Sequence, residues 1–211
     1  MNFLILKTND SKKLMKIAKE KTSFLPKQDI NIFHINKINN SMIHIVFHIP
    51  DEYHIGTKRG GSYLNVPFSQ YVNTFLFKNS SYFLMEYIEE NYIKELSNYI
   101  KKKTNADIFR VAMDNNLFNK LVSSLPGFIK QVEFIDENGD EQIIESLTID
   151  KFHNYCIDNK YTLEYILLNV DQQFISMDKN GKISVDNSDE KYLIKFTEVI
   201  VNALGSNWSY S

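Results

Sequence analysis

The stretch MIHIVFHIPDEYHIGTKRGG, residues 42–61, holds three of the five histidines in this chain and ends in a basic glycine loop. Histidine acts as a general acid or base near neutral pH and is a common metal ligand. Glycines beside cationic side chains let backbone N–H groups approach an anion. The stretch could therefore hold a metal ion, cradle a phosphate, or be an ordinary strand that runs into an ordinary loop.

Two β-type runs carry most of these histidines. Residues 29–38 and 42–49 predict a hairpin that turns near Asn40. With the turn there, odd-numbered residues share one face of the hairpin and even-numbered residues share the other. The odd face is the expected core face, and its apolar members are Phe33, Ile35, Ile43, Ile45, Phe47 and Ile49.

The spacing of the histidines argues against a metal site. His34, His44 and His48 share the even face, but four residues of strand place His44 about 13 Å from His48. A Zn–N bond is only about 2.0–2.1 Å long, so both cannot bind one ion. We therefore expect no metal, and we interpret this face as partly covered by a helix or as a partner surface. A hydrolase or nuclease site near His34, His48 and His54 is a further alternative.

The glycine loop GTKRGGS, residues 56–62, has some of the chemistry of an anion site. It matches neither the P-loop pattern nor G-x-G-x-x-G, so we expect a surface loop. Aromatic residues flank it, and aromatics beside cations can stack on bases. This keeps nucleic-acid binding as an alternative, for which the candidate residues are Lys58, Arg59, Gly60, Gly61, Lys101, Lys102 and Lys103.

Composition indicates a globular protein without a cofactor signature. The chain has 211 residues, of which 43% are hydrophobic and 24% are charged. Its single cysteine, Cys156, excludes an internal disulfide and is expected in the core. No apolar run approaches the ~20 residues of a membrane span, and the first residues do not resemble a signal peptide. We therefore expect a cytoplasmic protein with no membrane partner.

Charge divides the chain unevenly. Residues 1–105 carry 15 basic and 9 acidic groups, a net charge of +6, whereas residues 106–211 carry 9 basic and 17 acidic groups, a net charge of −8. The basic half could bind a polyanion, or the two halves could attract each other within one chain or between two. The segment DENGDE fails as a calcium loop. It offers candidate protein-binding residues: Asp136, Glu137, Asp140 and Glu141.

The first half predicts the order β-α-β-β-β-α-β over residues 1–125. A strand over 2–7 is followed by a helix capped near Asp10. After the hairpin, residues 50–67 read as a long loop and 68–78 as a strand. A helix with an apolar stripe from Leu84 to Tyr99 is then expected, followed by a strand over 106–114.

The second half, residues 126–211, predicts a repeated hairpin-helix pattern. Before this half begins, Asp114 caps a short helix that is stopped by Pro126-Gly127, the expected boundary of the halves. Asn-Gly turns at 138–139 and 180–181 predict two hairpins, and helices over 148–158 and 188–204 and a strand over 162–170 complete the pattern. We predict an α+β fold, a mostly antiparallel sheet with helices packed on one face, in two parts or as one continuous domain.

These observations favour a non-enzymatic protein-binding or regulatory protein. The sequence lacks a G-x-S-x-G motif, its tyrosine content is high, and its second half is acidic, which suits a basic protein partner. The use of Asn, Ile and Lys indicates a low-GC bacterium or phage. We expect a role in immunity or phage defence, with another protein or a second copy of this chain as the partner. Nucleic-acid binding and the histidine-based hydrolase remain the alternatives.

Overall fold

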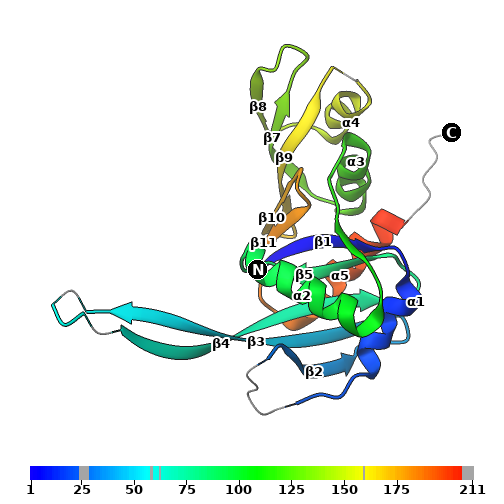
Figure 1. Ribbon diagram of the computed structural model, residues 1–211. Coiled ribbons are helices and arrows are strands. Elements are labelled where there is room, and N and C mark those ends of the chain that lie inside the picture. Colours follow the sequence, from blue (N-terminus) through cyan, green and yellow to red (C-terminus); the bar gives the residue numbers. More distant parts are fainter. Residues whose placement is uncertain (24–28, 58, 62, 159, 206–211) are drawn as a thin grey trace.

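The computed structural model describes residues 1–23, 29–57, 59–61, 63–158 and 160–205 (Figure 1). The helices are α1 Ser11–Leu14, η1 Met15–Lys19, α2 Glu90–Thr104, α3 Asn115–Ser124, α4 Ile149–Ile157 and α5 Glu190–Gly205. The strands are β1 Asn2–Thr8, β2 Asn31–Lys37, β3 Met42–Gly56, β4 Tyr63–Phe77, β5 Tyr82–Glu86, β6 Ile108–Arg110, β7 Phe128–Ile135, β8 Glu141–Glu145, β9 Thr162–Val170, β10 Gln173–Asp178 and β11 Lys182–Val185. In the described part of the chain, no helix combines the length and hydrophobicity needed to cross a membrane.

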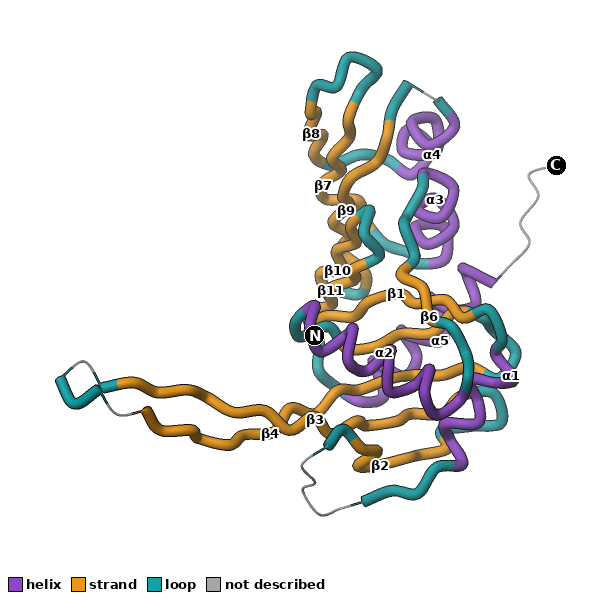
Figure 2. Tube along the Cα trace, viewed as in Figure 1, coloured by secondary structure: helices purple, strands orange, loops and turns teal. Residues whose placement is uncertain are grey.

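The described strands form one antiparallel sheet, and the prediction of an α+β fold is confirmed. The strand order is β2-β3-β4-β5-β1-β11-β10-β9-β7-β8, and β6 also pairs with β1. Figure 2 shows these strands as a twisted layer that runs through the length of the molecule. Strand β1 therefore joins the strands that precede α2 to those that follow α3.

Helices cover both faces of this sheet. Along β1, Phe3 and Ile5 belong to one hydrophobic core, while Leu4 and Leu6 belong to a second core on the other face. Helices α1, η1 and α2 pack on the second core, and α3, α4 and α5 pack on the first. Each group of helices thus lies on one face of the sheet, and the two groups take opposite faces. We call the side covered by α2 the α2 side of the sheet.

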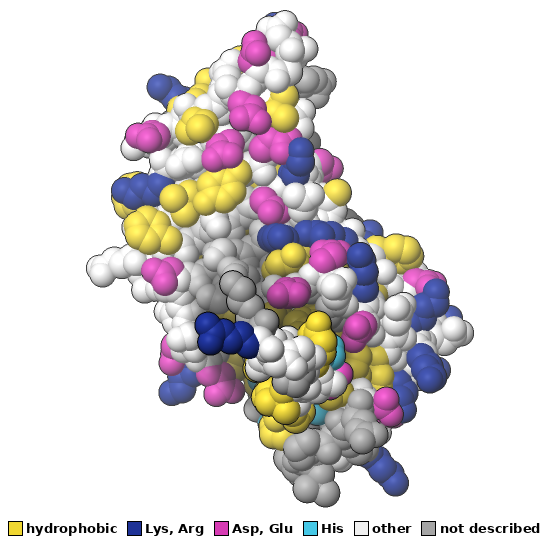
Figure 3. All heavy atoms as spheres, turned by 60° about the vertical axis from the view of Figure 1, so that its left-hand side comes forward, with side chains coloured by type: hydrophobic (Ala, Val, Ile, Leu, Met, Phe, Trp, Pro, Cys, Tyr) yellow, Lys and Arg dark blue, Asp and Glu magenta, His cyan; other side chains and the backbone are white. Residues whose placement is uncertain are grey.

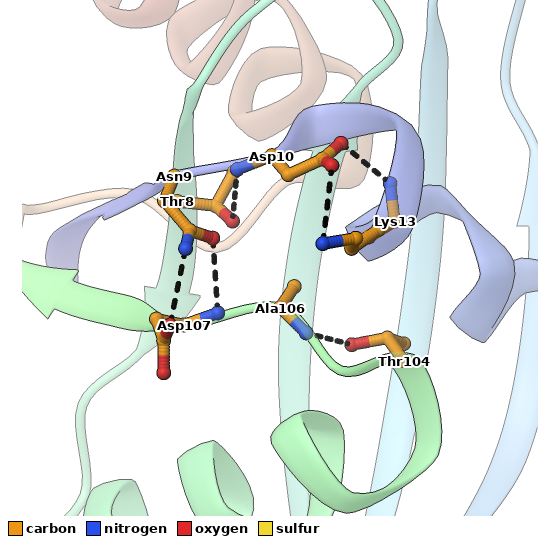
Figure 4. Close-up of polar contacts among 7 residues, drawn as sticks. All are labelled: Thr8, Asn9, Asp10, Lys13, Thr104, Ala106 and Asp107. Carbon is orange, nitrogen blue, oxygen red and sulfur yellow. Dashed lines mark hydrogen bonds and ion pairs between the residues drawn. The ribbon is translucent and has the colours of Figure 1, made fainter.

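Polar contacts close the junction between β1, α1 and β6 (Figure 4). Asp10 caps α1 as predicted, because its carboxylate accepts a hydrogen bond of 2.9 Å from the Lys13 backbone N–H. The Asn9 side chain donates to the Asp107 carboxylate at 3.0 Å and accepts from the Asp107 backbone N–H at 3.1 Å. The chain segment that follows α2 is thereby fixed to the end of β1.

The prediction of a helix with an apolar stripe from Leu84 to Tyr99 is wrong for its first turns. Residues 82–86 form β5, which pairs with β1 from Phe3↔Glu86 to Lys7↔Tyr82, and α2 begins only at Glu90. Three successive residues, Phe83 to Met85, are buried because β5 is covered on both faces. A doubly buried strand is apolar on both sides, so its sequence pattern also fits an apolar helical stripe.

The hairpin of β2 and β3 has the expected register near its turn, with Ile35 opposite Ile45. Ile43, Ile45 and Phe47 are buried, as predicted. The prediction for Phe33 is wrong, because the register shifts between Ile32 and His34. The shift turns the Phe33 ring to the opposite side, where it packs edge-on against Tyr71 at 5.0 Å.

Residues 50–67, expected to be a loop, instead lie largely within two strands of fifteen residues each. Strands β3 and β4 pair without interruption from Met42↔Phe77 to Gly56↔Tyr63. Pro50, Gly56 and Pro67 lie within this pairing, although proline and glycine usually mark turns. The consequence is a ribbon that extends well beyond its neighbouring strands.

The local signals from Asp114 onward are confirmed. Strand β9 spans the predicted residues, α4 and α5 match the expected helices within two residues, and Asp114 caps α3 by accepting from the Leu117 N–H at 2.8 Å. Both Asn-Gly pairs lie in tight hairpin turns, where Gly139 and Gly181 have φ values of 86° and 74°.

The two turn glycines should differ in their sensitivity to a side chain. A Cβ added at Gly181 would lie 2.3 Å from the Val111 carbonyl oxygen, whereas a Cβ at Gly139 would meet nothing within 4 Å. We expect Gly139→Ala to lower the free energy of unfolding by about 1 kcal/mol, the cost of positive φ. Gly181→Ala should cost more because Val111 must also move. Denaturant unfolding measures both changes, and equal losses would contradict this prediction.

Candidate functional site: the projecting arm

The outer part of the β3–β4 hairpin, residues 50–68, projects from the body of the molecule (Figure 1). We call this segment the arm. Among the described strands, β2 accompanies β3 only as far as His48, and β5 pairs with β4 only at Thr74 and Phe75. Beyond its base, where Asp51 contacts α2, no described helix or third strand lies against the arm. This part is a ribbon of two strands, an arrangement that is marginally stable by itself in water.

The register gives the arm one apolar face. Odd-numbered residues of β3 lie opposite even-numbered residues of β4, so that Tyr53 faces Val66 and Ile55 faces Leu64. The Phe68 ring stacks on Tyr53 with a centroid distance of 4.1 Å. We call this face the arm strip: Tyr53, Ile55, Leu64, Val66 and Phe68.

Much of the arm strip is open to solvent. Tyr53, Ile55 and Leu64 are 57%, 50% and 63% exposed, and Figure 3 shows hydrophobic side chains on the arm where it comes forward. The opposite face carries polar groups such as His54 and Asn65, which hydrogen-bond to each other at 2.8 Å. Contiguous exposed apolar surface with a polar rim is typical of an interaction site. Complete burial of one large apolar side chain stabilises a complex by roughly 1.5–3 kcal/mol.

The edges of the arm are less suited to binding than its apolar face. Pro50 lies in β3 and Pro67 in β4, both opposite a residue of the other strand. Proline is tolerated within a strand pair where its missing N–H would point away from the partner strand. Each proline therefore removes a donor from one outer edge, which impedes the addition of a further strand. The face of the arm, rather than an edge, is the candidate binding surface.

A contact with α2 holds the base of the arm. The Tyr92 hydroxyl donates a hydrogen bond to the Asp51 carboxylate. This bond is the main cause that lowers the pKa of Asp51, and it also raises the pKa of Tyr92. The contact fixes the direction in which the arm leaves the body.

His48 joins three strands just below the arm. Its side chain is buried, with Nδ1 3.0 Å from the Asn31 amide nitrogen and Nε2 2.8 Å from the Ser69 hydroxyl. Because the Asn31 amide donates to Nδ1, the ring proton resides on Nε2 and is donated to Ser69. Burial lowers the pKa of His48, which favours this neutral, fully bonded form. We infer that His48 connects β2, β3 and β4.

The other histidines of the hairpin have separate surroundings. His44 lies 2.9 Å from the Asn73 side-chain oxygen and stacks on Phe75, and desolvation is the main cause that lowers its pKa. His34 is exposed on β2, and His54 is exposed on the arm. Within the residues that the structure describes, no group of three or more His, Cys, Asp or Glu side chains could hold a metal ion.

Two other potential nucleophiles are not activated by their surroundings. Burial raises the pKa of the Cys156 thiol to about 12, so the reactive thiolate is disfavoured. Ser123 lies 3.3 Å from His153, but its hydroxyl donates at 2.7 Å to the Asn119 carbonyl oxygen. A nucleophilic serine needs its proton directed to the base, and this geometry does not provide it.

The basic residues proposed for nucleic acid are not brought together. Arg59, Gly60 and Gly61 lie at the tip of the arm, and Lys58 lies outside the described residues. Residues 101–103 end α2 on the opposite side of the body (Figure 1). There Lys101 pairs with Asp107 at 2.7 Å and Lys103 with Glu20 at 3.2 Å. The two basic groups thus belong to different surfaces.

The acidic residues proposed for protein binding lie at the β7–β8 turn, at the end of the molecule remote from the arm (Figure 1). The Asp136 carboxylate accepts hydrogen bonds from the backbone N–H groups of Asn138 and Asp140 at 2.9 and 3.1 Å. The backbone of this turn is the main cause that lowers the pKa of Asp136. Asp136 therefore orders the turn, and its neighbours Glu137, Asp140 and Glu141 are exposed around it.

The arm strip was not among the candidate residues from the sequence. Its signal was the alternation of apolar residues in YHI and LNVPF, over residues 53–55 and 64–68, which is typical of a half-buried strand. Prolines and glycines on either side favoured the interpretation as a loop. The chain matches no protein-family model, and it has no match among curated proteins.

Removal of the Tyr92 hydroxyl should release the base of the arm. We expect Tyr92→Phe to raise the pKa of Asp51 toward its ordinary value, measured by NMR titration of the carboxyl carbon. Stability from this carboxylate is present above the pKa of the unfolded chain and lost as pH falls through the lower folded pKa. The variant should also speed hydrogen exchange in residues 50–56. Tyr99→Phe, on the same helix, is the control, and an unchanged Asp51 titration in Tyr92→Phe would disprove the contact.

Acid should weaken the fold through His48. Because its folded pKa is lowered, the unfolded chain binds more protons as pH falls through about 6.5. We therefore expect the free energy of unfolding to decrease from about pH 7.5 to about pH 5, and His48→Gln to reduce that dependence, because glutamine stays neutral. His34→Gln, at an exposed position of β2, is the matched control. The same pH dependence in wild type and His48→Gln would contradict the assignment.

Proposed function

We propose that this protein is a non-enzymatic binding protein that contacts a partner protein through the arm strip. The observation that carries this proposal is a ribbon of two strands that leaves the body and exposes Tyr53, Ile55 and Leu64 on one face. Folding alone gives no reason to extend these side chains into water, because burial of apolar surface is the dominant driving force of folding. A partner that covers the strip provides that burial.

The chemistry of the arm favours a protein over nucleic acid. Residues 50–68 contain two acidic groups, Asp51 and Glu52, and two basic groups, Lys58 and Arg59, so the segment is neutral overall. Nucleic-acid binding depends mainly on several Lys or Arg contacts with phosphates, whereas the described residues of this face of the arm carry one charge, the acidic Asp51 opposite Phe68, and no Lys or Arg. Tyrosine and other aromatic residues are enriched at protein interfaces. The low-GC composition and the acidic second half are our grounds for placing this partner in bacterial immunity or phage defence.

Affinity capture with quantitative mass spectrometry tests this function. Tagged wild type is compared with Ile55→Ser plus Leu64→Ser, which removes the centre of the arm strip. The control, His54→Ser plus Asn65→Ser, changes the polar face of the same strands. We expect wild type and the control to retain a protein that the arm-strip variant loses by at least about tenfold, equivalent to 1.4 kcal/mol.

Two results would contradict the proposal. One is capture of the same proteins by wild type and by the arm-strip variant. The other is binding of DNA or RNA at physiological salt that falls steeply with added salt and is lost in Lys58→Ala plus Arg59→Ala. The steep salt dependence would indicate release of counterions from phosphates, and it would support the nucleic-acid alternative. All variants are first compared with wild type by thermal unfolding, so that a loss of binding is not confused with a loss of folding.

A further inference from the structure

We infer that the arm strip docks on the uncovered sheet face of β7 to β11 in a second copy of this chain. This inference rests on the proposed function, since it names the partner of the arm. We call the uncovered surface the open face. It consists of the outward side chains of these strands, and its apolar members include Phe128, Ile143, Tyr165, Leu167 and Phe174.

The open face presents large apolar groups beside carboxylates. Phe128 and Phe174 lie on either side of Asn169 in neighbouring strands, and they are 77% and 46% exposed. Ile143, on β8, is 64% exposed and lies opposite Glu133. Figure 3 shows hydrophobic side chains gathered above the arm, with acidic groups among them. Three of the described helices pack on the other side of these strands, and none of the three covers this one.

The arm strip and the open face lie on the same side of one sheet. Residues of β3 with the parity of the arm strip, such as Ile45 and Phe47, belong to the core beneath α2. In β1, Leu4 belongs to that core and lies opposite Lys182 of β11, so both side chains are on the α2 side. Ser184 is two residues from Lys182 and therefore on the same side. Ser184 pairs with Ser176 of β10, which pairs with Leu167 of β9, so these side chains are on the α2 side too. Helix α2 therefore covers the middle of the α2 side, and its two ends remain uncovered.

The two uncovered surfaces cannot meet within one molecule. The unbroken pairing of β3 with β4 and the bond from Tyr92 to Asp51 keep the arm directed away from the body. Figure 1 shows the arm and the column of strands β7 to β10 as two limbs that leave the body in different directions. Two such molecules, related by a twofold axis, can each lay an arm across the open face of the other. This arrangement is reciprocal and closes at two copies.

Charge favours this pairing. Arg59 lies at the tip of the arm, whereas the open face carries the acidic residues Glu133, Glu145 and Asp178 against Lys182. The same asymmetry extends to the halves of the chain, which carry +6 over residues 1–105 and −8 over residues 106–211. Opposite potentials across an interface select the partner and fix its orientation. A second copy supplies an apolar and acidic surface for an apolar arm with a basic tip.

Sedimentation equilibrium of the purified protein tests the inference. We expect wild type to reach twice its monomer mass of 24.8 kDa as concentration rises. Ile55→Ser plus Leu64→Ser should raise the dimer dissociation constant at least about tenfold. Phe128→Ser plus Phe174→Ser on the open face should do the same, and Ile143→Lys is a second open-face variant. The control, His54→Ser plus Asn65→Ser, should dimerise as wild type does.

Mixing provides a reciprocal test. The arm-strip variant keeps an intact open face, and the open-face variant keeps an intact arm, so one of the two contacts can form between them. We therefore expect a weak heterodimer in the mixture, at concentrations where each variant alone is monomeric. A tag on one variant and a fluorescent label on the other identify this heterodimer.

Several outcomes would overturn the inference. The first is a wild type that is still monomeric at about 100 μM, a concentration at which a dissociation constant near 1 μM gives almost complete dimer. The second is a dimer that the open-face variants do not weaken. If wild type is monomeric while affinity capture still depends on the arm strip, this inference fails and the proposed function stands. If capture is also independent of the arm strip, both fail.

Discussion

The burial of one strand on both faces holds this structure together. Four successive side chains of β1, Phe3 to Leu6, are almost wholly buried and alternate between the two cores. The β1 backbone pairs with β5, β6 and β11, so the strands of both halves depend on it. Burial of each such side chain contributes roughly 1.5–3 kcal/mol. The helices lie on opposite faces of the sheet as a direct result, because a strand with apolar side chains on both faces must be shielded from water on both faces.

Local signals predicted most of the second half and part of the first. Asn-Gly turns, the Asp10 and Asp114 caps and the apolar faces of α3 to α5 depend on residues that are close in sequence. Strand β5 could not be recognised in the same way. Its burial depends on β1, nearly eighty residues earlier in the chain, and an apolar run buried on both faces has no period of two.

The candidate site depends on contacts that the sequence does not display. The alternation around Tyr53 and Leu64 indicates an apolar face, but its exposure is decided by where β2 and β5 stop pairing. The histidines presented the opposite problem. Their potential chemistry was visible in the sequence. The residues that hydrogen-bond to the ring nitrogens of His48, Asn31 and Ser69, are distant from it in the chain. Residue type alone therefore overestimated the functional importance of the histidines and underestimated that of the arm.

The unbroken pairing of β3 with β4 limits how the arm can change during evolution. Side chains alternate with a period of two, so an insertion of one residue in a single strand would turn its outer part over. Tyr53 and Ile55 would then point away from Leu64 and Val66, which are their neighbours on the same face. The arm can therefore vary in reach only by matched changes in the two strands. Homologous chains with longer or shorter strands in the arm should differ in length by even numbers of residues.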